Sequence, residues 1–275
     1  MNPDVLLVGC GDLGTDIGQR LARRGHAVVG IRRRAELVPA PLIGLSADLT
    51  REVPRLPDLD LQYLVVALTA RPRTCQAYRA TYVEGLRRAL QALADAGQQP
   101  SRAVLISSTG VYGDVPSETL SDEATPAQPK DGPTRMLLEA EELFTAGIPG
   151  GTVLRLSGLY GRGPSGLAAR VQQGRITDPD RWTNRIHRDD AAAAVVHLLT
   201  LPEAPGRLYL GTDDEPALLR EVAAYLADRL RAPTPPPVDL ERGHGKRLSN
   251  ARLRATGWVP AYPTFRDGYR DYPDS

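Results

Sequence analysis

A glycine-rich turn between an apolar strand and an amphipathic helix is the feature that most restricts what this chain can fold into. The apolar run VLLV at residues 5–8 leads into GCGDLG at residues 9–14, which has the spacing G-x-G-x-x-G. A helical pattern follows and stops at Gly25, and a second apolar run occupies residues 27–31. In this strand–turn–helix–strand context the motif predicts a dinucleotide-binding site, and the alternative is a turn that binds nothing.

Each glycine has a distinct role in that interpretation. Gly9 permits the tight turn, Gly11 lets a pyrophosphate approach the backbone, and Gly14 lets the helix pack closely on the strand. The backbone N–H groups at the start of the helix, including those of Asp12 and Leu13, would then face the phosphates.

Three arginines follow the second apolar run, where folds of this kind contact the ribose of the adenosine. An acidic residue there binds the 2′-hydroxyl of NAD, whereas an arginine suits the 2′-phosphate of NADP. Arg32, Arg33 and Arg34 hold this position and no acid does. We therefore expect NADP as the cofactor, with NAD as the other option, and the alternative is a solvated run of charge.

Strands and helices alternate through the first 160 residues. Strands are predicted at 63–68, 103–106 and 152–156, and helices at 74–96 and 134–146. The alternation predicts an α/β fold of the Rossmann type, a doubly wound parallel sheet whose ligands bind beyond the carboxyl ends of the strands. Thr69 and Ser108 lie at such ends. Asp48 follows another short strand and could contact adenine, or it could instead cap a turn. Leu49 beside it is a further candidate for binding the cofactor.

The alternation of strands and helices changes near residue 160. This divides the chain into a dinucleotide-binding domain at 1–160 and a smaller α/β substrate lobe at 161–275, and the alternative is that the lobe is interleaved with the first domain. Residues 174–187 are polar and read as irregular. Helices are predicted at 189–199, 216–230 and 249–255, and the acids at 213–215 are expected to open the second of these. Residues 233–237 are predicted to form a rigid proline linker.

Composition excludes several classes of function. The net charge of +1 gives no field for nucleic acid or an anionic membrane, and the two cysteines argue against a disulfide framework. The dispersed histidines form no metal constellation. The N-terminus lacks the pattern of a signal peptide, and no apolar run is long enough to span a membrane. These features lead us to expect a soluble cytoplasmic protein with a small-molecule substrate.

Taken together and in order, the motifs resemble those of the extended short-chain dehydrogenase/reductase family, of the NAD-dependent epimerase/dehydratase type. The segments that carry the resemblance are GCGDLG (9–14), YVEG (82–85), SSTGVYG (107–113), LRLSGLYGRG (154–163), IHRDD (186–190), LYLGT (208–212) and LSNARL with GWVP (248–260). The resemblance implies a Rossmann domain with a C-terminal substrate lobe. Relatives often pair two subunits through helices, so a homodimer is one expectation.

The chain also departs from the family pattern, and the departures affect the chemistry. The glycine spacing differs from the usual G-x-x-G-x-x-G, and Tyr82 replaces an expected asparagine. The family's Tyr-x-x-x-Lys is missing, because Asp131 aligns with the tyrosine and Arg135 with the lysine. Residues 114–134 contain no tyrosine at all.

The resemblance still assigns roles to some residues. Ser108 would hold the reacting oxygen, and Arg135, in the lysine's place, would contact the nicotinamide ribose. Asp131 is a poor proton donor at neutral pH, and Arg135 one turn later would keep it ionised by pairing with it.

Other residues could replace the missing proton donor. Tyr82 could supply a hydroxyl or could simply pack in its helix. Histidine is the residue type that titrates near neutrality, so His187 could act as an acid/base or bind a substrate phosphate, or it could cap the following helix. Arg155, Asn184 and Arg185 could meet an anionic substrate.

The sequence thus predicts an NADP-binding oxidoreductase or epimerase that transfers a hydride at a carbonyl or carbinol carbon, for example of a nucleotide sugar or another phosphorylated molecule. The alternative is a catalytically inactive NADP(H)-binding sensor or regulatory protein. Such a protein would also be expected to lack the Tyr/Lys pair.

Overall fold

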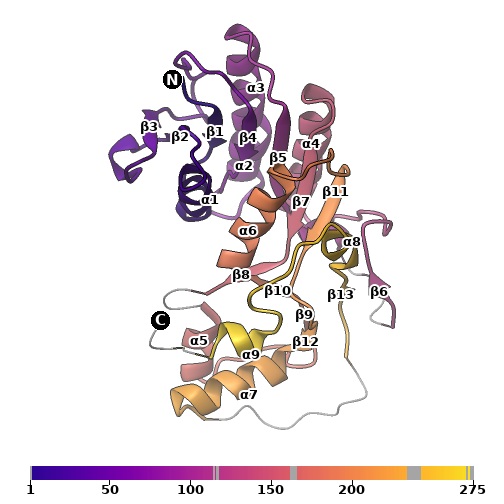
Figure 1. Ribbon diagram of the computed structural model, residues 1–275. Helices are drawn as coiled ribbons and strands as arrows, with labels where there is room; N and C mark the ends of the chain where they lie inside the picture. The colour runs from indigo at the N-terminus through magenta and orange to yellow at the C-terminus, as the bar shows by residue number, and fades with distance from the viewer. Residues whose placement is uncertain are drawn as a thin grey trace. The chain divides into compact units, whose positions relative to one another are not determined.

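The computed structural model describes residues 2–113, 115, 118–161, 166–233, 243–270 and 272 (Figure 1). Its main sheet has seven strands in the order β11-β7-β5-β4-β1-β2-β3, and β1 pairs in parallel with both β2 and β4. The strands are β1 (Val5–Val8), β2 (Val28–Arg32), β3 (Ile43–Ser46), β4 (Tyr63–Val66), β5 (Arg102–Ser108), β7 (Thr152–Leu156) and β11 (Leu208–Gly211). The predicted doubly wound α/β fold is confirmed.

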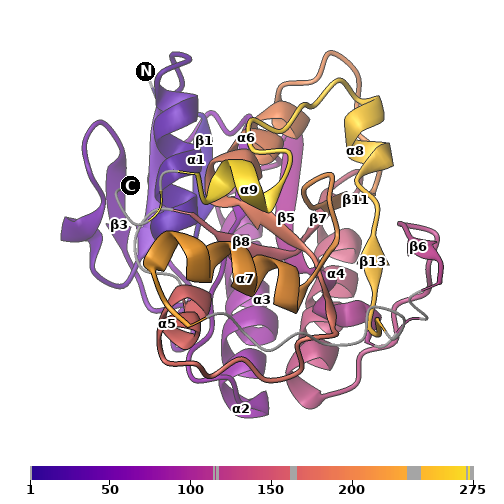
Figure 2. The same ribbon diagram turned by 90° about the horizontal axis from the view of Figure 1, so that it is seen from below.

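Helices cover both faces of this sheet (Figures 1 and 2). The helices α3 and α4 pack against each other on one face, whereas α1 and α6 lie on the other. Their bounds are α1 (Asp12–Ala22), α2 (Cys75–Tyr78), α3 (Gly85–Asp95), α4 (Gly132–Gly147) and α6 (Arg188–Leu199). None of the helices in the described part of the chain combines the length and the apolar character needed to cross a bilayer.

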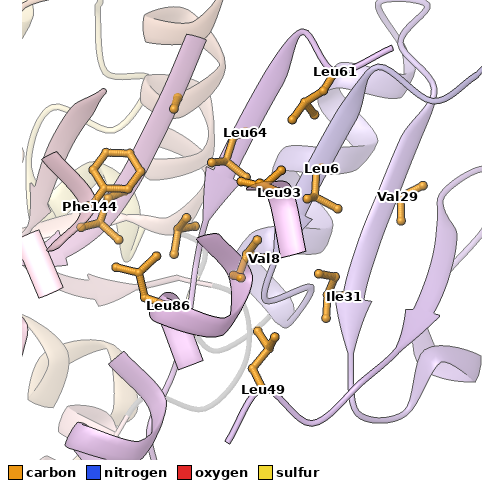
Figure 3. Close-up of a cluster of buried hydrophobic side chains, with 14 of the residues drawn as sticks. Leu6, Val8, Val29, Ile31, Leu49, Leu61, Leu64, Leu86, Leu93 and Phe144 are labelled. Carbon is orange, nitrogen blue, oxygen red and sulfur yellow. The ribbon is translucent and has the colours of Figure 1, made fainter. Parts of the chain in front are cut away.

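A cluster of buried apolar side chains joins the sheet to its helices (Figure 3). Leu6 and Val8 of β1 lie in the middle of it, with Ile31 on one side and Phe144 of α4 on the other. All four are at most 2% exposed. Burial of each such side chain contributes about 1.5–3 kcal/mol, so the strand before the glycine turn is held firmly in place.

The helix predicted at 74–96 is confirmed, but it is not uniform. The Thr74 hydroxyl caps its start by accepting from Ala77 N at 3.2 Å, and Gly97 ends it with a φ of +62°. Between α2 and α3 the residues Arg79–Glu84 form a turn of π-helix (η2) that packs against α4. Such turns often accompany functional sites, and this one carries Tyr82.

The described chain divides into two compact units, each made of three segments. Unit 1 comprises Met1–Val111, Ala127–Arg155 and Ala192–Tyr209, and unit 2 comprises Tyr112–Pro126, Leu156–Ala191 and Leu210–Ser275. The two units are described separately below.

Unit 2 contains short strands that the sequence pattern does not reveal. The expectation of irregular structure at 174–187 is wrong, because β9 (Trp182–Thr183) pairs antiparallel with β12 (Ala217–Leu218), and β10 (Arg185–His187) pairs in parallel with β8 (Gly158–Tyr160). β6 (Leu120–Ser121) likewise pairs with β13 (Arg247–Leu248). The remaining helices are α5 (Gly166–Gln172), α7 (Leu219–Leu230), α8 (Ala251–Ala255) and α9 (Phe265–Gly268).

The expected start of the helix at 216–230 is also wrong. α7 begins at Leu219, and its first turn is closed by Glu221, whose Oε2 accepts from Leu218 N at 2.9 Å. The acids 213–215 precede β12 and do not open the helix; Asp213 is only 1% exposed. The proline linker predicted at 233–237 lies outside the described residues except for its first residue.

Candidate functional site

The glycine turn of unit 1 has the geometry that its sequence predicts. Gly9 has a φ of +98°, and a side-chain carbon there would lie 2.5 Å from the carbonyl oxygen of Ala67. A side-chain carbon at Gly14 would collide with the carbonyl oxygen of Gly9. Both positions therefore require glycine, the first for the turn and the second for the close approach of α1 to it.

Gly11 differs from these two glycines because the space around it is open. A side-chain carbon there would meet no atom within 4 Å. Gly11 is the N-cap of α1, and no side chain caps this helix start. The backbone N–H groups of Asp12, Leu13 and Gly14 have no acceptor in a preceding helical turn. Together with the helix dipole they form a site suited to an anion such as a pyrophosphate.

The arginines after β2 lie in two different settings. Arg32 is half-buried, and its Nη1 donates to Cys10 O at 3.3 Å and to Leu37 O at 3.5 Å. Arg33 and Arg34 are exposed. All three lie at or just after the end of β2, and Arg32 is the one with a hydrogen bond to the glycine turn among the described residues.

The two residues after β3 that were predicted to bind the cofactor also differ. The Asp48 carboxylate accepts from Thr50 N at 3.0 Å and from the Thr50 hydroxyl at 2.6 Å. These bonds, led by the hydroxyl, lower the pKa of Asp48, and Arg33 adds to the effect. Leu49 is 7% exposed in the apolar cluster. The capping role is therefore present at Asp48. The buried side chain of Leu49 cannot meet a ligand, and its carbonyl already accepts from Arg88 Nη1 at 2.9 Å.

The carboxyl ends of β4 and β5 carry the next candidates. Thr69 is exposed beyond β4. Ser108 ends β5, and its Oγ accepts from Gly110 N at 3.1 Å. A side-chain carbon at Gly110 would lie 3.4 Å from that Oγ and 3.3 Å from the methyl group of Thr134. The Ser108 hydroxyl therefore lies next to the first turn of α4.

The residue aligned with the family's tyrosine, Asp131, caps that turn. Its Oδ1 accepts from Thr134 N and from the Thr134 hydroxyl, both at 2.7 Å. Its Oδ2 pairs with Arg73 Nη2 at 3.0 Å, so the expected partner, Arg135, is a wrong assignment. Hydrogen bonds from Thr134, and then Arg73, lower the pKa of Asp131. Asp131 is therefore an anion at neutral pH and donates no proton.

Arg135 lies on α4 with an exposed side chain. Its backbone N–H donates to Asp131 O at 3.1 Å, and its guanidinium makes no hydrogen bond or ion pair with any described residue. It can therefore reach a ligand without first breaking a contact.

Tyr82 lies on the π-helical turn and packs partly into the apolar cluster. Its ring centroid is 5.0 Å from that of Tyr78. Burial raises its pKa, Tyr78 adds to the rise, and the backbone of Ala70 opposes it. Arg73, whose guanidinium is 6.0 Å from the Tyr78 ring, also opposes it. Tyr82 is thus a neutral phenol in this setting.

In unit 2, the IHRDD segment is held by contacts of its own. His187 is 5% exposed, and its Nδ1 accepts from Asp189 N at 3.2 Å, which caps α6. The ring of Tyr262 lies over it with centroids 3.8 Å apart. Asp190 is 2% exposed and accepts from Ala261 N at 2.7 Å and from Tyr262 N at 2.9 Å. Asp190 therefore fixes the aromatic ring that covers His187.

A second buried group of unit 2 surrounds Asp213 and Arg185. Burial raises the pKa of Asp213 to about 8, and the nearby Arg185 opposes the rise. Neither carboxylate oxygen has a hydrogen-bond partner of good geometry among the described residues, and the same holds for Arg185 Nη1. Tyr160, which is 7% exposed, belongs to this group, and burial raises its pKa strongly.

Two residues suggested for an anionic substrate have other contacts. Arg155 is buried in unit 1 and forms a bidentate pair with Glu141, with Nη2–Oε2 at 2.7 Å. The Ser107 hydroxyl donates to the same carboxylate at 2.5 Å. Asn184 bridges the backbone of Lys246 and Leu248 in unit 2. These side chains hold their own elements together, and the suggestion is wrong for both.

Sequence reasoning missed Arg73, Glu141 and Asp190. Asp190 lies in the IHRDD segment, so the pair of acids at a helix start was a usable signal. The partners of Arg73 and Glu141 lie 58 and 14 residues away, and no local pattern marks either pair. No group of three His, Cys, Asp or Glu residues within the described ranges is arranged to hold a metal ion.

Comparison with known proteins connects these features to one family. The model of the NAD dependent epimerase/dehydratase family matches residues 5–210. The chain is 30% identical to a 3-diazoavenalumate denitrifying reductase from a Streptomyces species, over 96% of this chain and 98% of that protein.

Solved structures give the same picture. A Methylobacillus flagellatus structure whose description names the same family is 37% identical, covers 98% of this chain and 97% of its own, and has a TM-score of 0.82. The Thermus thermophilus UDP-glucose 4-epimerase, solved with NAD, shares the fold at 23% identity and a TM-score of 0.75, over 97% of this chain and 96% of its own.

Proposed function

The chain belongs to the NAD dependent epimerase/dehydratase family, and on that premise we propose that it is an NADP-dependent oxidoreductase or epimerase. Its reaction would be hydride transfer at a carbonyl or carbinol carbon of a small substrate, with nucleotide sugars and other phosphorylated molecules the favoured class. The observation that carries the proposal is the uncapped start of α1 with open space at Gly11.

The residues present fit a dinucleotide. Gly11 leaves room for a pyrophosphate, and the amides of Asp12 to Gly14 are oriented to receive it. The bound cofactor would supply or accept a hydride at nicotinamide C4. Arg33, at the end of β2, supports NADP over NAD, because its exposed guanidinium can meet a 2′-phosphate. Arg135 on α4 is the proposed contact for the nicotinamide ribose.

Ser108 is the proposed hydrogen-bond donor to the reacting oxygen of the substrate. Its Oγ already accepts from Gly110 N, so its own proton points elsewhere and can be donated. Tyr82 is the one proposed source of a phenolic proton in unit 1. Asp131 is excluded from that role because it is ionised and paired with Arg73.

A hydride acceptor that needs no proton from the protein is a second candidate substrate. The specific observation in its favour is the ionised carboxylate at the position of the family's tyrosine. The Streptomyces relative is named as a reductase of a diazo compound. Replacement of a diazonium group by hydrogen, with release of N2, consumes one hydride and no proton. Such a reaction would leave Ser108 as a binding group only.

Transfer of label from NADPH tests whether the protein is an enzyme. The purified protein is incubated with NADPH deuterated at C4, in each stereochemical form, and with either a set of nucleotide sugars or a simple arenediazonium salt. The proposal expects deuterium in one product and a matching loss of NADPH absorbance. If no substrate and no metabolite of a cell extract takes up label while NADPH binds, the protein is a sensor or regulator instead.

A further inference from the structure

Cys10, the residue between the first two glycines, contacts β2 through its N–H, its carbonyl oxygen and its sulfur. Its N–H donates to Ile31 O at 2.9 Å, and its carbonyl accepts from Arg32 Nη1 at 3.3 Å. Its sulfur lies against Gly30, where a side-chain carbon would come within 2.7 Å of Sγ. Cys10 is fully buried as a result. These contacts fasten the glycine turn to β2.

Of these contacts to Cys10, one comes from a side chain of the arginine run, and that side chain is Arg32. Its Nη1 also donates to Leu37 O at 3.5 Å, so the guanidinium joins the glycine turn to the short 3-10 turn at 35–37 (η1). Arg33 and Arg34 differ in this respect. Their guanidinium groups are exposed and make no hydrogen bond or ion pair within the described part of the chain.

We propose that Arg32 is a positioning residue that holds the glycine turn against β2, and that Arg33, rather than Arg32, discriminates NADP from NAD. The inference deepens the proposed function and rests on it. Within an arginine run that looks uniform in the sequence, it separates Arg32, a structural guanidinium, from Arg33, a ligand-binding guanidinium.

The physical reason lies in what each guanidinium would lose on meeting a phosphate. Arg32 would have to give up two backbone acceptors, and the glycine turn would lose one of its attachments. Arg33 gives up nothing, and its charge already acts on the neighbouring Asp48. A 2′-phosphate adds charge that an exposed arginine binds through charge-assisted hydrogen bonds. Loss of Arg32 should therefore weaken both dinucleotides equally, whereas loss of Arg33 should weaken only NADP.

Titration of the wild type and four variants with NADPH and NADH tests the division. Arg33→Ala should lower the affinity for NADPH about tenfold or more and change that for NADH less than twofold. Arg32→Ala should lower both affinities by a similar factor of about three to ten. Arg32→Lys should lose less than Arg32→Ala, because both contacts come from the single atom Nη1 and a lysine ammonium can still donate to the two carbonyls. Arg23→Ala, an exposed arginine near the far end of α1, is the control and should change neither.

The reactivity of the Cys10 thiol provides a readout that does not need a cofactor. Each protein is treated with a thiol reagent under native conditions, and digestion with mass spectrometry separates labelling at Cys10 from labelling at the exposed Cys75. In Arg32→Ala, labelling of Cys10 should accelerate at least fivefold at a temperature well below unfolding, while labelling of Cys75 stays constant. Arg33→Ala should leave Cys10 as protected as in the wild type.

The two arms separate the possible failures. If the wild type binds neither dinucleotide, the proposed function fails, and the thiol arm still decides whether Arg32 holds the turn. If Arg32→Ala loses NADPH selectively, or if Cys10 stays protected in it, the positioning role is overturned. A loss of both cofactors in Arg33→Ala overturns its role as the discriminating residue.

Discussion

The glycine turn of unit 1 and the IHRDD segment of unit 2 are both motifs that the sequence singles out, but the structure uses their polar groups differently. At the glycine turn, the start of α1 has no side-chain cap and Gly11 faces open space. In the IHRDD segment, His187 Nδ1 caps α6 and both oxygens of Asp190 accept backbone hydrogen bonds. The glycine turn leaves backbone N–H donors available to a ligand, whereas the polar atoms of the IHRDD segment accept hydrogen bonds from the protein's own backbone.

From this difference we expect the first motif to serve binding and the second to serve assembly of the fold. Polar atoms that already have good internal partners cannot bind a ligand without losing them. Substitutions in the glycine turn should therefore separate binding from stability, and substitutions in the IHRDD segment should mainly change stability.

The largest expected effect is at Asp190. Asp190→Ala removes the acceptor of two backbone N–H groups that lie 71 and 72 residues away in the chain. Leaving buried donors unpaired should lower the free energy of unfolding by about 3 kcal/mol. Chemical denaturation measures the change, and Asp190→Asn, which keeps one oxygen, should lose less. A change below about 1 kcal/mol would mean that the loop at 261–262 is held by other contacts.

A pair of glycine substitutions sharpens the comparison next. Gly11→Val places its side chain in open space where the pyrophosphate is proposed to bind, so the affinity for NADPH should fall by more than about 30-fold, near 2 kcal/mol, with little change in melting temperature. Gly14→Ala meets the carbonyl of Gly9 and should destabilise the fold. Normal NADPH binding by Gly11→Val would show that the phosphates do not approach this turn.

Asp213 tests whether the interior of unit 2 responds to pH. Its pKa in the folded protein is about 8, above the value near 3.9 of the unfolded chain. The folded state then binds more protons, so stability is present at low pH and declines as the pH rises from about 4 to about 8. In the wild type, the free energy of unfolding should decline by more than about 1.4 kcal/mol between pH 5 and pH 9 through this group. Asp213→Asn should lack this decline. Parallel stability profiles of the two proteins would contradict the assignment.

The smallest expected effect is at His187. His187→Ala should lower the free energy of unfolding by about 1 kcal/mol through loss of the cap of α6, and His187→Asn, which keeps an acceptor, should restore most of it. Both variants should bind NADPH like the wild type. A loss of hydride transfer of more than a hundredfold in His187→Asn, with stability preserved, would instead show an acid/base role.

The parts of the molecule that the sequence predicts are those in which neighbouring residues determine the structure. The step from β1 through Gly9 into α1 depends on an apolar run, a turn and a helical period within 20 residues. Parts that depend on distant partners were missed or misread. The two-residue strands β9 and β12 exist only because they pair with each other.

The same limit applies to the candidate site. Asp131 was predicted to pair with Arg135, which is close in sequence, but its partner is Arg73. Arg155 was suggested only as a residue that could meet an anionic substrate, and it is buried against Glu141. A charged residue in a sequence shows what chemistry is available, and only the folded chain shows whether that charge already has a partner.

The most direct test of the account is a calorimetric titration of the wild-type protein and Gly11→Val with NADPH and with NADH. The account predicts binding of both dinucleotides by the wild type, tighter for NADPH, and weak binding of either by a folded Gly11→Val. Absence of binding by the wild type would contradict it, because the uncapped start of α1 would then have no dinucleotide to receive.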